Sequence, residues 1–327
     1  MNKSIPKAAY LDDAFFQLEQ RYIFSKCWAF AGLVEDLAEN GDYITVQAGL
    51  NNIFVTRDAK AQLLAFHNMC RHRGTQLLEG KGQLKNKLTC PYHDWSYDLQ
   101  GNLASLPKQR TEFADIDKSC LGLRKAQVSI FKGMIWVHPD LKAAPLAEWL
   151  EPIVNHIGPH DVESLVESAN DIQVEEINAN WKIVAENYID HYHLAQLHAG
   201  TLNMYDHKKA EFGFDGHHFR FWEPLTKEYA QNLEKNAPLP LIEQPTESEY
   251  GAWVPMIFPG IGLAATECSW SVFHIIPLAV DKTRVVLRSK VKDCSSFEYL
   301  KQSAKSSQYW HRKTTAKHAH FAQEHPL

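Results

Sequence analysis

Two short motifs that each place a cysteine close to a histidine constrain the fold of this chain more than any other feature. Cys70 and His72 are separated by one residue and Cys90 and His93 by two, with seventeen residues between the motifs. A thiolate and an imidazole at such spacing can bind a metal from one tight loop. Because a site with four protein ligands needs both motifs, we expect two loops whose tips meet.

The order of the ligands bears on which metal is bound. Zinc sites usually group like ligands, with two cysteines on one loop and two histidines elsewhere. Here each loop supplies one cysteine and one histidine. That order suits a 2Fe–2S cluster in which one iron takes both thiolates and the other iron takes both imidazoles. A zinc site is the competing interpretation, and a third is two unrelated buried cysteines with histidines nearby.

Short alternating apolar runs surround the two motifs and indicate a small antiparallel β unit. Turns containing Gly, Asn and Asp separate the runs, and the last run ends near Pro139. Ahead of them, an amphipathic pattern predicts an N-terminal helix within 12–28 that packs on the body of the protein. The runs are 43–46, 53–56, 63–66, 128–131 and 134–137.

A stretch containing Pro and Ala at 139–145 marks the expected domain boundary, in a chain whose length allows about two domains. Beyond it the pattern predicts a helix ending near Ile157 and a long helical segment from about 181 to 198. The polar segment 227–249 is expected to be irregular. Strands are expected at 173–178, 219–222, 269–277 and 283–291.

Composition narrows the classes of protein. With 34 Lys and Arg against 39 Asp and Glu, the chain lacks the basic excess of nucleic-acid binders. Its longest nearly apolar stretch, 254–265, is short and interrupted by Pro and Gly, so we expect no membrane span. Six cysteines are too sparse for a disulfide scaffold, and residues 1–9 have no apolar signal core. We therefore expect a cytoplasmic protein with reduced thiols.

A second group of possible metal ligands follows in the segment 180–198. Asp190 and His193 are three residues apart and share one face of an ideal helix, whereas His193 and His198 are five apart. Five residues correspond to about 140° around the helix axis. Both histidines can face one metal only if the helix bends, ends or carries a bulge between them. Taken alone, the two histidines would be interpreted as solvated or core imidazoles.

Together the two groups resemble the Rieske non-haem iron oxygenases, in particular their terminal oxygenase alpha subunits of ring-hydroxylating or amine-monooxygenase type. The Cys and His motifs, with Arg, Gly, Pro, Tyr and Trp around them, look like the Rieske domain of that family. The string NWKIVAENYIDHYHLAQLH over 180–198 resembles the signature of its catalytic domain. The resemblance implies that a Rieske 2Fe–2S cluster is held by Cys70, His72, Cys90 and His93.

The same resemblance assigns roles in the second group. His193 and His198, with a later carboxylate, would hold mononuclear Fe(II) and leave positions open for O2 and substrate. Asp190 would lie between the Rieske cluster of one subunit and the iron of its neighbour, hydrogen-bonded to an imidazole of each. Asn187 would lie near the iron. The family often has one more residue between this Asn and this Asp than the two found here.

The third iron ligand is the largest departure from the family pattern. The family supplies it as an Asp or Glu on a C-terminal helix, but this chain ends in HAHFAQEHPL. We expect that the segment carrying the carboxylate is missing, and Glu324 is the weak candidate within the chain. Without that carboxylate, iron affinity should fall and water should replace the ligand.

The resemblance also implies an overall architecture of class α+β. An N-terminal helical segment, 1–40, would pack on the catalytic domain, and 41–145 would form the small antiparallel Rieske domain. Residues 146–327 would form a helix-grip (Bet v1/START-like) catalytic domain with an antiparallel sheet, incomplete at its C-terminus. The pocket is expected to draw on 205–222 and 253–271, which mix aromatic and acidic residues.

The implied function is that of a terminal oxygenase component, a mono- or dioxygenase that hydroxylates a small aromatic or amine substrate with O2. Electrons would come from a separate NAD(P)H-dependent flavin and iron–sulfur reductase, and the assembly would be a homotrimer. The alternative is a Rieske electron-transfer or binding protein that lacks a complete iron site. The missing ligand favours that alternative, whereas His193, His198 and Asp190 oppose it.

Overall fold

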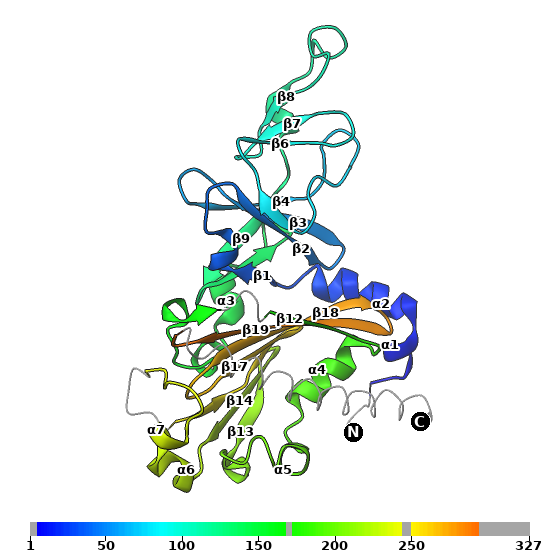
Figure 1. Cartoon of the computed structure of the whole chain (residues 1–327). Coiled ribbons are helices and arrows are strands. Elements are labelled where there is room, and N and C mark those ends of the chain that lie inside the picture. The colour runs from blue at the N-terminus through cyan, green and yellow to red at the C-terminus, as the bar shows by residue number, and fades with distance from the viewer. Residues whose placement is uncertain (1–4, 168–171, 244–249, 294–327) are drawn as a thin grey trace. The chain divides into compact units, whose positions relative to one another are not determined.

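The computed structural model describes residues 5–167, 172–243 and 250–293. The chain divides into two compact units, one of residues 18–149 and the other containing 1–17 and 150–327. Each unit is built on antiparallel sheets, with short helices at their margins (Figure 1), so the predicted α+β class is confirmed. No helix in the described part of the chain is both long and apolar enough to cross a membrane.

The first unit contains a seven-stranded sheet and a three-stranded sheet, both antiparallel. All five runs predicted for this unit are strands of the larger sheet. Its order is β1 (Ala29–Leu33), β10 (Met134–His138), β9 (Lys125–Phe131), β4 (Leu63–His67), β3 (Asn51–Arg57), β2 (Asp42–Ala48) and β5 (Lys81–Gln83). The smaller sheet has the order β6 (Lys87–Thr89), β7 (Ser96–Asp98) and β8 (Leu103–Ser105).

The larger sheet buries side chains on both faces. Phe54 on β3 packs on Phe66 of β4, with ring centroids 5.4 Å apart. These two rings belong to a buried cluster that extends to Trp95, Tyr97 and the two motif cysteines. Since alternate residues of a strand face opposite sides, the residues flanking Phe54 point into a second core of Ile, Val and Ala. The first core thus fixes the three-stranded sheet, and with it both motif loops.

The second unit is built on a nine-stranded antiparallel sheet. The strands predicted at 173–178, 219–222, 269–277 and 283–291 are present as β12, β14, β18 and β19. Its main path runs β11 (Val166–Glu167), β19 (Lys282–Val291), β18 (Trp270–Ala279), β17 (Ile261–Ala265), β15 (Gly251–Trp253), β14 (His218–Pro224) and β13 (Glu211–Asp215). Two further strands lie off this path, β12 (Gln173–Ile177) on β19 and β16 (Met256–Ile257) on β14 and β17.

Helix α4 (Trp181–Ile189) packs against this sheet (Figure 1). Its first turn is capped by the side chain of Asn180, which accepts a hydrogen bond from the backbone N–H of Lys182. Near its end, the hydroxyl of Tyr188 donates to the carbonyl of Leu263 at 2.6 Å. A Cβ at Gly262 would come within 2.4 Å of the Tyr188 ring, so only glycine allows this ring to lie on β17.

Helix boundaries differ from the sequence prediction in several places. The continuous helix expected over 181–198 is wrong, because the backbone of Asp190 is extended (φ −73°, ψ 108°) and separates α4 from the short α5 (Leu194–Leu197). The irregular segment expected from 227 is also partly wrong, since Thr226 caps α6 (Lys227–Gln231) and α7 (Leu233–Asn236) follows. Residues 244–249 lie outside the described part of the chain.

The two other predicted helices are shorter than expected. The predicted range 12–28 contains α2 (Asp13–Glu19), followed by a π-helical turn over Gln20–Phe24, and the unpredicted α1 (Ala8–Leu11) lies ahead of it. The helix expected to end near Ile157 is α3 (Leu146–Leu150), followed by a 3-10 turn over Val154–His156. Amphipathic spacing alone did not predict where these helices end, because each helical piece spans only one or two turns and is too short for a clear periodic pattern.

Candidate active site

The two motif loops of the first unit, 68–80 and 90–95, share one backbone geometry. In each loop the cysteine N–H donates to the carbonyl five residues later, and the N–H four residues later donates back to the cysteine carbonyl. The residue at that fourth position has positive φ in both loops, 74° at Gly74 and 57° at Asp94. The pairs are Cys70 with Thr75 (2.8 Å) and Gly74 (3.0 Å), and Cys90 with Trp95 (2.8 Å) and Asp94 (3.1 Å).

The repeated geometry brings the four motif side chains together. Cys70 and Cys90 are 2% and 1% exposed and belong to the same buried cluster. The rings of His72 and His93 have centroids 4.7 Å apart. Trp95 stacks on His72 at 4.8 Å with an interplanar angle of 7°, which fixes the orientation of that imidazole. The arrangement places two thiols on the buried side and two imidazoles on the more exposed side.

The chemical state of these side chains suits metal ligands. The buried Nδ1 of His72 has no hydrogen-bond partner among the described residues, so it is available to an electron-pair acceptor. Burial, together with the nearby His93, lowers the pKa of His72 and favours the neutral imidazole that binds metals. Burial raises the pKa of the Cys70 thiol, which a bound metal would oppose by stabilising the thiolate.

Two buried polar residues that sequence reasoning missed hold the first loop in place. The hydroxyl of Tyr97 accepts from the N–H of Arg71 at 3.0 Å and lies 3.3 Å from the sulfur of Cys70. The amide of Asn68 donates to Leu78 O at 2.7 Å and accepts from Leu78 N–H at 2.9 Å. A lone Tyr or Asn carries no sequence signal unless its three-dimensional partners are known.

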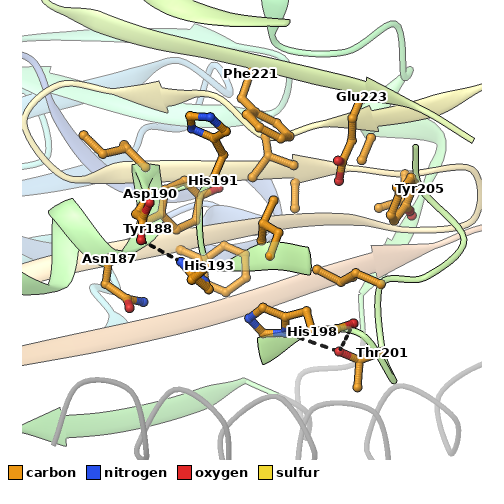
Figure 2. Close-up of a pocket in the computed structure, with 18 residues that line it drawn as sticks. Asn187, Tyr188, Asp190, His191, His193, His198, Thr201, Tyr205, Phe221 and Glu223 are labelled. Atoms are coloured by element: carbon orange, nitrogen blue, oxygen red, sulfur yellow. Dashed lines mark hydrogen bonds and ion pairs between the residues drawn. The ribbon is translucent and has the colours of Figure 1, made fainter. Parts of the chain in front are cut away.

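The second unit contains a cavity of about 330 Å³ between the α4–α5 region and the strands of the sheet (Figure 2). It receives His193, His198, Asp190 and Asn187, all singled out from the sequence. The expected pocket ranges contribute Tyr205, Phe221, Val254, Ala264 and Thr266, and the ranges missed Glu223, Ala252 and Phe273. The remaining described lining residues are Tyr188, Ile189, His191, Leu194, Thr201 and Leu202.

His193 and His198 flank the single turn of α5, as its N-cap and C-cap residues. Their ring centroids are 5.3 Å apart, within reach of one ion given metal–nitrogen bonds of about 2 Å. Nδ1 of His193 is 3.0 Å from Oδ2 of Asp190, and Nδ1 of His198 is 3.2 Å from the hydroxyl of Thr201. Both rings can therefore present Nε2 to a metal.

Asp190 is ionised in this setting. Burial alone would raise its pKa, but the hydrogen bonds from His193 and from the N–H of Tyr192 outweigh burial and lower it. The Oδ1 atom of Asn187 is buried without a hydrogen-bond partner in the described structure. Among the described residues, no three His, Cys, Asp or Glu side chains are gathered closely enough to hold a metal ion. Glu324, the candidate third ligand, lies outside the described residues.

A buried carboxylate that sequence reasoning missed lies at the other end of the cavity. Glu223 on β14 is 2% exposed and lines the cavity together with Phe221, two residues earlier on the same face of the strand. The Nδ1 of His207 donates to its Oε2 at 2.7 Å. Behind this wall, Tyr205 donates to the buried Glu267 at 3.0 Å. The only sequence signal for Glu223 is that side chains of a strand alternate between its two faces. That alternation does not tell which face of β14 borders a cavity.

Comparison with protein families identifies both units. The model of the Rieske 2Fe–2S domain matches residues 27–128. The model of the ring-hydroxylating alpha subunit, catalytic domain, matches residues 154–323. A Rieske domain holds a 2Fe–2S cluster, and the catalytic domain of ring-hydroxylating alpha subunits holds a mononuclear iron.

Several oxygenase subunits are similar in sequence. This chain is 35% identical over 201 residues to the glycine betaine monooxygenase oxygenase subunit of Chromohalobacter salexigens. The matched region covers 61% of this chain and 44% of that protein. It is 33% identical over 201 residues to the large oxygenase component of the naphthalene 1,2-dioxygenase system of Pseudomonas putida, covering 58% and 43%. The chain thus spans about half the length of the curated relatives that it matches.

Solved structures share the fold. The crystal structure of a quaternary ammonium Rieske monooxygenase with L-carnitine superposes with a TM-score of 0.79 at 22% identity, covering 98% of this chain and 86% of that one. Naphthalene 1,2-dioxygenase with bound indole gives 0.74 at 22% identity, covering 98% and 80%. These likenesses confirm the predicted pairing of an antiparallel Rieske domain with a helix-and-sheet catalytic domain. The chain belongs to the family of Rieske-type ring-hydroxylating oxygenase alpha subunits.

Proposed function

We propose that this chain is the terminal oxygenase component of a Rieske-type system that uses O2 to hydroxylate a small organic substrate, aromatic or amine. The observation that carries the proposal is that His193, His198 and Asp190 border one cavity while the four Cys and His side chains meet in the other unit. A pure electron carrier would have no use for His193, His198 and Asp190 at a cavity.

In the unit of residues 18–149, Cys70, His72, Cys90 and His93 would hold the cluster. The matching geometry of the two loops gives each loop one thiol and one imidazole at equivalent positions. Trp95 and Tyr97 keep His72 and Cys70 in their orientations. When bound, the cluster supplies electrons one at a time, and the iron supplies a centre that activates O2.

In the other unit, His193 and His198 would hold the iron, and Asp190 would act through His193. Its carboxylate accepts from Nδ1–H, which fixes the tautomer and leaves Nε2 for the metal. The apolar wall of Phe221, Val254 and Phe273 excludes water from the space where a substrate would lie. Asn187 places a buried amide beside this space, and its carbonyl oxygen accepts no hydrogen bond from the described residues.

The remaining assignments concern partners. We propose a homotrimer in which Asp190 connects the cluster of one subunit to the iron of its neighbour. Electrons would reach the cluster from a separate NAD(P)H-dependent flavin and iron–sulfur reductase. The described cysteines at 27, 70, 90, 120 and 268 are all free thiols, which leads us to propose a reducing, cytoplasmic setting.

Cys90→Ser tests the cluster site. Removing one thiolate should abolish the visible absorbance and the EPR signal of a Rieske cluster, because two ligands are needed by each iron. Cys268→Ser is the matched control, since Cys268 is also buried, at 6% exposure, but belongs to another unit. Retention of the Rieske signal in Cys90→Ser would overturn the assignment of the cluster ligands.

His193→Ala tests the iron site independently. The variant should keep the Rieske EPR signal but lose mononuclear iron, measured as iron in excess of two per chain. His191→Ala is the control, because His191 borders the same cavity with its ring 3.7 Å from that of Phe212. If iron content is the same in wild type and His193→Ala, the second site is wrong and the electron-carrier alternative stands.

A further inference from the structure

The cavity contains a carboxylate that the proposed iron site does not use. Two acidic residues line it among the described residues, Asp190 and Glu223. Asp190 is engaged with His193 through one oxygen and with the N–H of Tyr192 through the other. Glu223 comes from a different element, β14, and Figure 2 shows its carboxylate directed into the space opposite the Asp190 end.

Glu223 is buried and only half satisfied. His207 donates to Oε2 at 2.7 Å, and no hydrogen bond to Oε1 is formed by the residues that the structure describes. Burial and the neighbouring Asp206 raise the pKa of Glu223, against the effect of His207. An isolated buried carboxylate is costly unless a positive partner or further hydrogen bonds reach it. The free oxygen therefore calls for a cationic or hydrogen-bonding ligand in the cavity.

The rest of the wall favours a cation over a neutral donor. Four aromatic rings line the cavity, and their faces attract positive charge. No Lys or Arg is present among the described lining residues, so nothing of that kind offsets the two carboxylates. Phe221 shares the face of β14 with Glu223, and Tyr205 lies near Glu223 in Figure 2. The rings are those of Tyr188, Tyr205, Phe221 and Phe273.

We infer that the cavity selects substrates that carry an ammonium cation and that the carboxylate of Glu223 recognises the positive charge. Tyr205 and Phe221 enclose the alkyl groups on the nitrogen. This inference rests on the proposed oxygenase function and narrows its substrate class from aromatic or amine to cationic amine. Glu223 serves here as a specificity residue. Among the described residues it forms no three-ligand group with His193 and His198, and Figure 2 places it away from the Asp190 end of the cavity.

The test compares two ligands of nearly equal shape by calorimetry on the intact protein. Choline carries a trimethylammonium group, and 3,3-dimethylbutan-1-ol replaces its nitrogen by carbon and has no charge. The wild type should bind choline at least about tenfold more tightly, because cation–aromatic and charge–charge attraction act only on choline. Equal binding of the two, or binding of neither, would overturn the inference without any variant being needed.

Three variants locate the preference. Glu223→Gln keeps the size of the side chain and should weaken choline binding on the order of 30-fold while leaving the neutral alcohol unchanged. Glu223→Asp keeps the charge and should retain part of the preference. Glu267→Gln is the matched control, since Glu267 is equally buried, at 2% exposure, but does not line the cavity, and its preference should stay within about twofold of wild type.

The outcomes separate this inference from the proposed function. Loss of the preference in Glu267→Gln to the same extent as in Glu223→Gln would show that the preference does not depend on direct contact with the Glu223 carboxylate and would overturn the role of Glu223, whether the loss came from net charge or from the bond between Glu267 and Tyr205. The Rieske EPR signal and the mononuclear iron content are measured on the same samples. A protein that carries both metal centres but ignores the charge of the ligand refutes only the substrate class, whereas absent centres refute the oxygenase itself.

Discussion

At the scale of single residues, Tyr97 shows how one hydroxyl can tune a centre that it does not ligate. Its side chain is 0% exposed, and its oxygen accepts the N–H of Arg71 and lies 3.3 Å from the sulfur of Cys70. If Cys70 is a metal-bound thiolate with no proton, the hydroxyl of Tyr97 is the donor in this pair. Hydrogen bonds to cluster sulfurs stabilise the reduced, more negative state. The proposed cluster should therefore have a higher reduction potential with Tyr97 than without it.

We expect Tyr97→Phe to lower the reduction potential of the cluster by about 40 mV, the equivalent of about 1 kcal/mol for a one-electron couple. The measurement is a potentiometric titration followed by EPR. Tyr92→Phe is the control, because Tyr92 lies in the other loop with 59% exposure and its ring packs on His93. An unchanged potential in Tyr97→Phe would mean that the hydroxyl of Tyr97 does not stabilise the reduced cluster.

Some of these site residues could be predicted from the sequence and others could not, for a physical reason. The motif cysteines and histidines stand out because metal chelation demands two reactive side chains at short spacing. Tyr97 and Glu223 act through partners distant in sequence, such as Cys70 and His207, which are 27 and 16 residues away. A single polar residue in an alternating strand looks the same whether it faces solvent, a core or a cavity.

At the scale of elements, β19 is tied to its neighbours by two arginine–glutamate pairs that differ in burial. Arg288 donates Nε and Nη2 to both oxygens of Glu167 on β11, at 2.7 and 2.6 Å, and both side chains are below 10% exposed. Arg284 donates to Glu176 on β12 at 2.7 Å, with both side chains near 40% exposed. Solvent screens the second pair far more than the first.

Glu167→Gln should lower the free energy of unfolding by about 3 kcal/mol, because it removes the charge of one partner from a buried, two-point ion pair with Arg288. Glu176→Gln should shift the unfolding midpoint little, since water replaces the lost contact. Urea unfolding followed by fluorescence compares the two variants under identical conditions. Equal shifts would contradict the view that burial governs the strength of these pairs.

The same scale explains which elements could be predicted. Strands such as β2, β3 and β18 follow from alternation that continues over several residues. The break between α4 and α5 could not be found that way, because apolar spacing persists through Asp190 while tertiary contacts set its extended backbone. The prediction that the two histidines need an interrupted helix did identify the constraint. The structure satisfies it by placing one histidine at each end of α5.

At the scale of the whole molecule, the proposed function divides labour between two compact units of one chain, 18–149 and the unit containing 150–327. A closed trimer with identical interfaces allows each cluster to serve the iron of the next subunit. Such a ring has a testable signature, since a defect in the cluster and a defect in the iron site can then complement each other between subunits.

Co-expression of Cys90→Ser and His193→Ala should restore activity that neither variant has alone. In randomly mixed trimers, about a quarter of the sites combine an intact cluster with an intact iron on the neighbouring subunit. The measurement is product per chain in a single turnover after chemical reduction, which requires no reductase. Transfer within one subunit predicts no recovery at all, so an inactive mixture would exclude the intersubunit route.

The one-turn helix α5 also bears on how the chain tolerates changes in length. His193 and His198 are held at opposite ends of this turn. Inserting or deleting one residue between them would rotate the second imidazole by about 100° around the helix axis and withdraw it from the cavity. We therefore expect natural variants and designed libraries to keep this five-residue step fixed, and to keep the length of the segment from His198 to Tyr205, because Leu202 and Tyr205 also line the cavity.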